Sequence, residues 1–353
     1  MEKWLFLHTL KPFLFSSFSM QTFYQSELRK TITTQVYKKP SFTVDIAWVS
    51  YQGIVKVQRK LGRTFRWFMV HGVMLERIDT FIPALKESAE HLRRDYGKSV
   101  GDIFFQIGAI NVIHTQPTRE LKNPEVRAEI LKKRTYHAND LKQRYGFVPS
   151  RREHMPTATI VLDLTKGEAG LHADLSESCR RYINKGKREQ LTFEQATTDT
   201  EFEAYRELRY TMSFDKWFSV VSKESFVELM RYLTHHNAWT LRVARKGDQL
   251  VCGAVYLFWE KQLVYLYGAT DRSFGHIWAQ YRLTREIMCR WVKQQYTSLD
   301  LLGIMPTGVE THHLSGVTRF KQSFGWETID YIWNYDLIFN NRLYKAFKMI
   351  KGS

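Results

Sequence analysis

The order of secondary-structure elements expected in the second half of the chain constrains its fold more than any single motif does. Residues 157–164 alternate in a pattern typical of a strand. The sequence beyond them predicts, in chain order, helices over 199–213 and 222–235, strands over 239–245, 250–259 and 262–267, a helix over 278–296 and a strand over 299–302. Only Gly247-Asp248 and Glu260-Lys261 separate the three consecutive strands, so we expect an antiparallel meander. Thr200 and Glu203 form a capping-box pattern at the start of the first helix.

Helix, helix, meander, helix and strand in this order are typical of an acetyltransferase-like domain. The first half of the chain shows a shorter version: a hairpin over 43–58 that turns at Tyr51-Gln52-Gly53, strands over 65–70 and 102–114, and a helix over 81–96. No fixed-period repeat accompanies this similarity. Since 353 residues exceed what one hydrophobic core usually organises, we expect an α/β (α+β) fold of two tandem acetyltransferase-like domains.

The boundary between these domains is expected in a strongly basic segment. Residues 116–152 hold ten basic and four acidic residues, and a helix is expected within them, over 126–145. This charge suits a phosphate backbone and equally a solvated helix face, and the sequence leaves both interpretations open. The expected division is an N-terminal extension at 1–19, a first domain with its basic linker at 20–150, a second domain at 151–338, and a C-terminal segment at 339–353 that packs on the first domain.

Charge and cysteine content favour a cytoplasmic protein that attracts polyanions. The formal net charge of +16 attracts nucleic acid, phosphate-bearing substrates or an anionic membrane surface without distinguishing them. The three cysteines are widely spaced and odd in number, so we expect no disulfide framework. Lys11-Pro12 interrupts the apolar start of the chain and no small-residue cleavage site follows, which disfavours export. The sequence does not decide whether the protein also contacts the inner face of the membrane peripherally.

Several common catalytic motifs are missing. The sequence contains no phosphate loop of the G-x-x-x-x-G-K-[ST] type, no G-x-G-x-x-G after a strand, no G-x-S-x-G elbow and no H-E-x-x-H. Kinase, dehydrogenase, hydrolase and metalloprotease functions are therefore disfavoured. The pairs His235-His236 and His312-His313 are adjacent, so their side chains diverge, and we expect no metal site.

The junction after the meander departs from a loop that binds coenzyme A. Acetyltransferases place a Q/R-x-x-G-x-G/A loop there, and its backbone amides meet the pyrophosphate. Residues 268–276 offer one glycine where two small residues are needed, and Asp271 would repel a phosphate. Acetyl-coenzyme A is therefore disfavoured as a donor.

Five short motifs form the most specific pattern in the sequence. They are, in chain order, QTFYQS at 21–26, RRYINK at 180–185, YLYGA at 265–269, GVTRFKQSFG at 316–325 and YDL at 335–337. In this order they resemble the FemABX (Fem) family of non-ribosomal peptidyl transferases, in its compact, armless form. The resemblance implies transfer of an amino acid from aminoacyl-tRNA to an amine on the stem peptide of a lipid-linked or nucleotide-linked peptidoglycan precursor. Aminoacyl-tRNA is then a co-substrate, and no other cofactor is implied.

The resemblance also implies roles for individual residues. Lys321 of the R-F-K motif would stabilise the oxyanion of the tetrahedral intermediate, Phe320 would shape the site, and Arg319 would bind substrate. The diphosphate of the precursor would be held by Arg180, Arg181 and Lys185. Without the resemblance, the sequence is also consistent with Lys321 in an exposed turn. It is likewise consistent with Arg180, Arg181 and Lys185 on a solvated basic helix.

Other parts of the site are less determined. Tyr265 and Tyr267 alternate along an expected strand, so we expect both on one face, either lining a substrate groove or packing in the core. Family members carry an acidic residue where residues 105–111 have no carboxylate, so the contact to the acceptor is expected to differ. Two other functions stay open: an acyl-coenzyme A-dependent N-acyltransferase of the same fold, and a non-catalytic RNA-binding protein.

Overall fold

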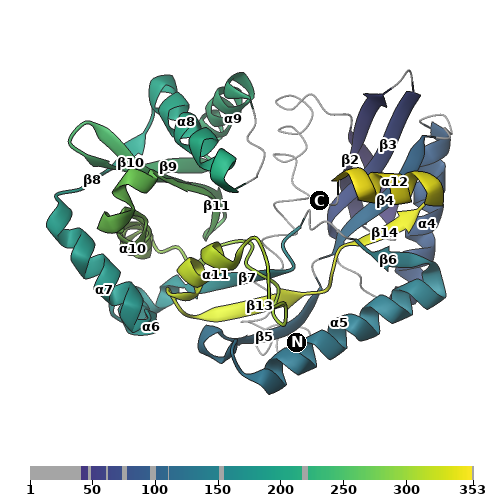
Figure 1. The fold of residues 1–353 in the computed structure, drawn as a ribbon, viewed down its shortest axis with the longest axis horizontal. Coiled ribbons are helices and arrows are strands. Elements are labelled where there is room, and N and C mark those ends of the chain that lie inside the picture. The colour runs from purple at the N-terminus through teal and green to yellow at the C-terminus, as the bar shows by residue number, and fades with distance from the viewer. Residues whose placement is uncertain are drawn as a thin grey trace, which may run out of the picture.

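Two β-sheets with helices packed against them make up the described part of the chain (Figure 1). This computed structural model describes residues 41–46, 49–60, 63–73, 78–95, 101–109, 111–150, 155–216 and 222–351. The expected N-terminal extension at 1–19 and the motif at 21–26 lie outside these ranges. The two mixed sheets confirm the predicted α/β fold class.

The first sheet has six strands in the order β1-β2-β3-β4-β14-β6. Their bounds, in this order, are Ser41–Ile46, Val49–Lys60, Arg63–Val73, Asp102–Ala109, Tyr335–Ile338 and Phe147–Pro149. Helix α4, Ile78–Asp95, contributes Leu85, Ala89 and Leu92 to the buried cluster of this sheet, as their helical spacing predicts. Phe68 and Phe105 belong to the same cluster.

The second sheet has eight strands in the order β5-β13-β7-β12-β11-β10-β9-β8. Their bounds, in this order, are Val112–Pro117, Glu327–Tyr331, Ala158–Asp163, Ser298–Asp300, Gln262–Thr270, Gln249–Trp259, Trp239–Lys246 and Thr192–Ala196. Antiparallel pairing of β9, β10 and β11 confirms the predicted meander.

Helices cover both faces of the second sheet. Tyr256 of β10 lies in one buried cluster with residues of α6 (Gly167–Asp174), α7 (Glu177–Gly186) and α10 (Ala279–Lys293). The next residue, Val255, lies in another cluster with residues of α8 (Asp199–Lys216) and α9 (Lys223–His235). Because neighbouring residues of a strand face opposite sides, the two clusters lie on opposite faces of the sheet.

The two sheets exchange strands. Strand β5 follows β4 in the chain but pairs with β13 of the second sheet, whereas β14 follows β13 and pairs with β4 and β6 of the first sheet. Helix α5, Pro124–Tyr145, connects β5 with β6 and runs beneath both sheets in Figure 1. Helix α12, Asn341–Lys351, packs on the first sheet, where Phe347 contacts the rings of Trp67 and Phe104.

Three local expectations were wrong. The single strand expected over 102–114 is two strands, β4 and β5, which belong to different sheets. The sequence at Tyr51-Gln52-Gly53 does not turn; Gly53 pairs with Phe42 of β1 and Val70 of β3, so it is an interior glycine of β2. The capping box lies two residues earlier than predicted. Thr198 N donates to Glu201 Oε2 at 2.9 Å, and Glu201 N donates to Thr198 Oγ1 at 3.3 Å.

A buried ion pair joins α5 to the second sheet. Arg134 Nη2 donates to Asp330 Oδ1 of β13 at 2.9 Å, and the two side chains are 1% and 0% exposed. Arg134 also donates to the carbonyl oxygens of Thr157, at 3.0 Å, and Thr307, at 2.8 Å. Thr307 Oγ1 donates to Asp330 Oδ2 at 2.9 Å. One guanidinium therefore fixes α5, β13, the start of β7 and the segment after β12.

We expect Arg134→Met to lower the free energy of unfolding by about 3–5 kcal/mol, because it leaves Asp330 buried without its cation. Urea denaturation measures the loss. The matched control is Arg144→Met at the exposed end of α5, where the pair with Asp140 is worth less than about 1 kcal/mol. Equal losses in the two variants would contradict the anchoring role of Arg134.

Candidate functional site

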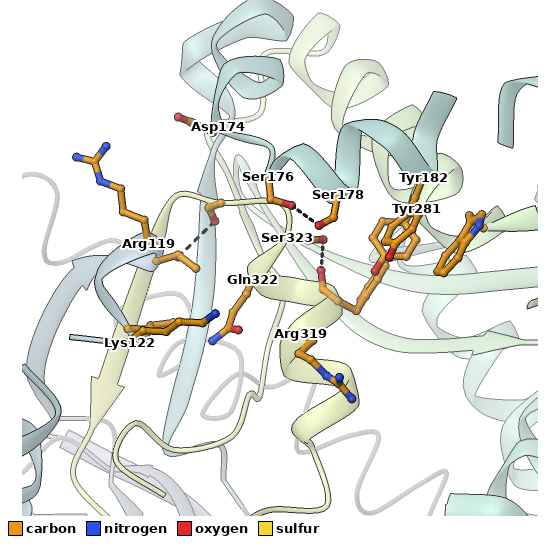
Figure 2. A pocket seen from close by; sticks show the side chains of 16 residues that line it. Arg119, Lys122, Asp174, Ser176, Ser178, Tyr182, Tyr281, Arg319, Gln322 and Ser323 are labelled. Carbon is orange, nitrogen blue, oxygen red and sulfur yellow. Dashed lines mark hydrogen bonds between the residues drawn. The ribbon is translucent and has the colours of Figure 1, made fainter. Parts of the chain in front are cut away.

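A cavity of about 800 Å³ opens where the first half of the chain meets the second (Figure 2). One wall is residues 118–122, the turn that follows β5. The other walls are the end of α6, the start of α7, the start of α10, and α11 with the residues after it. Helix α11 spans Ser315–Gln322 and carries the R-F-K motif. The volume lies within the range of small-molecule sites.

The cavity is cationic. Arg119 and Lys122 line the first wall and Arg319 lines the wall of α11, and all three are exposed. In the described part of the chain none of them forms an ion pair. The carboxylate at the rim, Asp174, is already paired with Lys166 at 2.7 Å. The three cations therefore remain available for an anionic ligand.

Aromatic rings form the wall near α10. Tyr182 of α7 stacks on Trp278 with ring centroids 3.7 Å apart and planes 11° apart. Tyr281 meets Phe320 of α11 edge to face at 4.9 Å. Trp278 has φ of +57°, a left-handed conformation that is unfavourable for a residue with a side chain, and it precedes α10 without a side-chain cap. Such a ring surface offers stacking partners for a planar group.

Helix α11 has two functional faces. Gly316, Arg319, Phe320 and Ser323 line the cavity at helical spacing. Thr318 lies on the other side, where Met305 N donates to its Oγ1 at 2.7 Å. The helix therefore separates the cavity from the segment that follows β12.

Lys321 lies on this second face and is not among the residues that line the cavity. It is 6% exposed, and its Nζ donates to Leu302 O at 3.1 Å and Gly303 O at 2.7 Å. Burial lowers the pKa of Lys321 to about 8, and Asp300 partly opposes this shift. The exposed-turn alternative is wrong, because Lys321 is a buried helical residue. Its oxyanion role stays a prediction.

The basic residues of α7 do not line this cavity. Arg181 and Lys185 are exposed, and Arg180 Nη1 donates to Leu175 O at 2.7 Å. The helix presents Ser178 and Tyr182 to the cavity instead. Phosphate binding by Arg180, Arg181 and Lys185 stays a prediction.

Tyr265 and Tyr267 do not share a face, so that expectation was wrong. Tyr256 of β10 pairs with Tyr265, and Val255 pairs with Tyr267, which leaves Leu266 as the extra residue of a β-bulge. Tyr265 is buried beneath α10, where Gln280 Nε2 donates to its hydroxyl at 3.1 Å. Tyr267 packs on the opposite side, with the guanidinium of Arg209 3.8 Å from its ring centroid.

The junction after β11 is a turn in which the carboxylate of Asp271 accepts from Ser273. Ser273 donates to Asp271 Oδ1 from both its backbone N, at 2.9 Å, and its hydroxyl, at 2.7 Å. The carboxylate thus takes the place of an anionic ligand at this turn. A Cβ added to Gly268 would lie 1.7 Å from the hydroxyl of Tyr265, so this glycine serves packing.

Within the stretch 105–111, which has no carboxylate, Gln106 has a structural role. Gln106 of β4 is buried, and its Nε2 donates to Asp336 Oδ1 of β14 at 2.8 Å and to Ser150 Oγ at 2.7 Å. Tyr344 of α12 donates to the other oxygen of Asp336 at 2.6 Å. Gln106 therefore links the exchanged strand to the first sheet.

Sequence reasoning found the segments that form most of the cavity but few of its individual residues. Arg119 and Lys122 lie in the basic segment and Tyr182 in the 180–185 motif, whereas no local signal singled out Trp278 or Tyr281. Within the described ranges, no group of three or more His, Cys, Asp or Glu side chains could hold a metal ion. In the same ranges, no helix is long and apolar enough to cross a membrane.

We expect Gly325→Ala to lower the free energy of unfolding by at least about 1 kcal/mol and to disturb the cavity wall. Gly325 has φ of +81°, and an added Cβ would lie 2.2 Å from Asp174 O. The control is Gly316→Ala on the same wall, where an added Cβ meets nothing within 4 Å. Thermal unfolding compares the two, and equal stability would refute this role of Gly325.

Comparison with known proteins agrees with the motifs. Residues 235–352 match the FemAB family model, and no curated protein sequence matches the chain. Among solved structures, the chain is similar to FemX with a TM-score of 0.63 and 12% identity, over 94% of this chain and 98% of that one. It is also similar to L-PGS from Bacillus licheniformis, with a TM-score of 0.46 and 12% identity over 93% of this chain and 96% of that one. A GCN5-related N-acetyltransferase from Sphaerobacter thermophilus gives a TM-score of 0.45 and 8% identity over 82% of this chain and 76% of that one.

The sequence match covers the meander, the R-F-K motif and the exchanged strand β14. The likeness to FemX extends the shared fold over nearly the whole chain. Residues 235–352 thus match the FemAB family, and the chain shares the fold of FemX over nearly its whole length.

Proposed function

We propose that this protein is an aminoacyltransferase that moves an amino acid from aminoacyl-tRNA to an amine on the stem peptide of a peptidoglycan precursor. The FemAB match supports a transferase of peptidoglycan bridge formation in general. One observation carries the finer proposal: Arg319 and Phe320 of the R-F-K motif line a cavity that combines aromatic rings with unpaired cations.

This combination suits the single-stranded 3′ end of a tRNA. Arg119, Lys122 and Arg319 approach from two walls and are placed to bind backbone phosphates. The rings of Trp278 and Tyr281 offer stacking surfaces, and stacking of a base on an aromatic ring is worth about 1–3 kcal/mol. Asp271 repels a phosphate at the junction used by acyl-coenzyme A enzymes, which favours the RNA-linked donor.

The proposed reaction needs positioning more than acid–base catalysis. The acceptor amine attacks the ester carbonyl, a C–N bond forms, the C–O bond to the ribose breaks, and the ribose hydroxyl leaves with a proton. Two N–H groups of Lys321 are held by the carbonyls of Leu302 and Gly303, on the face of α11 that does not line the cavity. We assign the third N–H to the developing oxyanion, which requires the acyl end of the donor to extend past α11 to this face. Water or the substrate takes the proton of the amine, since no side chain is a convincing general base.

Transfer is tested directly by incubating the full chain with radiolabelled aminoacyl-tRNAs and with either nucleotide-linked or lipid-linked precursor. Labelled precursor that disappears after ribonuclease treatment of the donor is the expected result. Transfer from acetyl-coenzyme A instead would replace the proposal with an acyl-coenzyme A-dependent reaction. Binding of tRNA without any product would indicate a non-catalytic RNA-binding protein.

We expect Lys321→Ala to lower kcat by about 10² or more while precursor binding changes little, because the ammonium acts in the transition state. Single-turnover transfer and equilibrium binding measure the two effects separately. Lys293→Ala, at an exposed lysine of α10, is the control. Activity within a few-fold of the wild type would remove Lys321 from the mechanism.

Neutralising the cavity cations should weaken donor binding in a salt-dependent way. For Arg319→Gln, and for Arg119→Gln with Lys122→Gln, the slope of log K against log salt should fall by about 0.7 for each lost phosphate contact. Lys142→Gln, at the far end of α5, should leave the slope unchanged. Slopes equal to the wild type in all variants would place the tRNA elsewhere.

A further inference from the structure

Strands β11 and β12 separate immediately after Asp300. This residue pairs with Val264 of β11 and is the last residue of β12. The chain beyond it still bonds to β7, from Leu301 N to Ile160 O at 2.8 Å. After Asp300 the chain is therefore no longer paired with β11 but is still paired with β7. Lys321 of α11 binds the chain at this point, through the carbonyls of Leu302 and Gly303.

One residue at this opening is bound through both of its backbone polar groups. Leu302 has φ of +58°, a left-handed conformation that is unfavourable for a residue with a Cβ. Its N–H donates to Asp300 Oδ1 at 2.7 Å, and its carbonyl oxygen accepts from Lys321 Nζ at 3.1 Å. Asp300 and Lys321 thus hold the same residue in this conformation.

Among the described residues, only one of the two carboxylate oxygens of Asp300 accepts hydrogen bonds. Its side chain is 3% exposed, and Thr159 donates its hydroxyl to Oδ1. In the described part of the chain, Oδ2 is buried with no hydrogen-bond partner. A buried carboxylate oxygen without a donor is costly unless a nearby cation compensates it. Lys321 binds the carbonyl of the same Leu302 whose N–H Asp300 accepts, and its charge opposes the rise that burial causes in the pKa of Asp300.

We propose that Asp300 is a positioning residue for Lys321: by binding Leu302 N it holds the backbone of Leu302 in the conformation in which the carbonyls of Leu302 and Gly303 orient the ammonium, and its charge stabilises that ammonium. The catalytic consequence rests on the proposed function. The coupling itself does not, because the two side chains interact whether or not the protein transfers amino acids. Asp300 need not touch a substrate.

The other titratable groups near Lys321 are neutral where it titrates. The ring centroid of Tyr265 lies 5.8 Å from Lys321 Nζ, and burial raises the pKa of Tyr265 well above its ordinary value. Around the neighbouring residues of α11, burial raises the pKa of Cys179 to about 11 and that of Tyr281 to about 12. In the described part of the chain, Asp300 is therefore the carboxylate that acts on Lys321.

A double-mutant cycle on the full chain tests the coupling without any substrate. Asp300→Asn keeps an oxygen that accepts from Leu302 N but removes the charge, and Lys321→Met removes the ammonium. At pH 7 we expect Asp300→Asn to cost more stability in the wild type than in Lys321→Met, as measured by urea denaturation. At pH 10 this difference should shrink, because Lys321, with a pKa of about 8, is then neutral in the folded state. Additive effects at both pH values would overturn the proposal.

The sign of the pH dependence gives a second measurement. The pKa of Lys321 is lower in the folded chain than in the unfolded one, so the wild type should gain stability relative to Lys321→Met as the pH rises above about 8. In Asp300→Asn this gain should begin at lower pH. Asp163→Asn, at the end of the adjacent strand β7, is the control and should leave the onset in place.

Two further outcomes keep the test decisive. If Asp300→Asn does not fold, Thr159→Val, which removes one donor to Oδ1, should give a smaller coupling of the same sign, and no coupling would overturn the proposal. In the transfer assay, the alkaline fall of kcat/KM should move to lower pH by about one unit or more in Asp300→Asn. Coupling in the cycle with an unmoved pH profile would refute the oxyanion role of Lys321 while leaving the pair itself established.

Discussion

The ion pair of Arg134 and Asp330 determines where the walls of the cavity stand. Helix α5, which carries Arg134, begins just after residues 118–122, and β13, which carries Asp330, begins just after Gly325. Both flanking segments line the cavity. An unpaired buried charge is strongly unfavourable, so the pair permits little relative movement of these two walls. The positions of the exposed cations Arg119 and Lys122 therefore depend on the Arg134–Asp330 ion pair, which does not line the cavity.

Under the proposed function, helix α11 carries both donor-binding residues and the lysine assigned to the oxyanion. Its cavity face carries Arg319 and Phe320, and its opposite face carries Thr318 and Lys321, which bind the segment after β12. A ligand bound in the cavity would contact the same helix that carries the ammonium of Lys321 on its opposite face. Gly325, just after this helix, packs so closely against Asp174 O that there is no room for a Cβ, and this contact fixes the end of the helix.

Sequence periodicity predicted the elements of the second half well because each covers enough residues for its repeat to be visible. It failed where one residue changes the pattern: the extra Leu266 turns Tyr267 to the opposite face, and the central Gly53 of β2 resembles a turn. The motif residues Arg319 and Phe320 were found because their pattern is local. Tyr182 and Trp278 meet across α7 and α10, and no sequence spacing encodes that contact.

The strand exchange constrains the order in which the strands of the first sheet can pair during folding. Strand β4 is made early, but its neighbour β14, Tyr335–Ile338, is made much later, and β6 pairs in the first sheet with β14. During synthesis this edge of β4 therefore stays open until residues 335–338 have been produced. Such late, long-range pairing is slow, and exposed strand edges promote aggregation. A shortened version that ends before residue 335 lacks β14, the strand between β4 and β6, so its first sheet is interrupted.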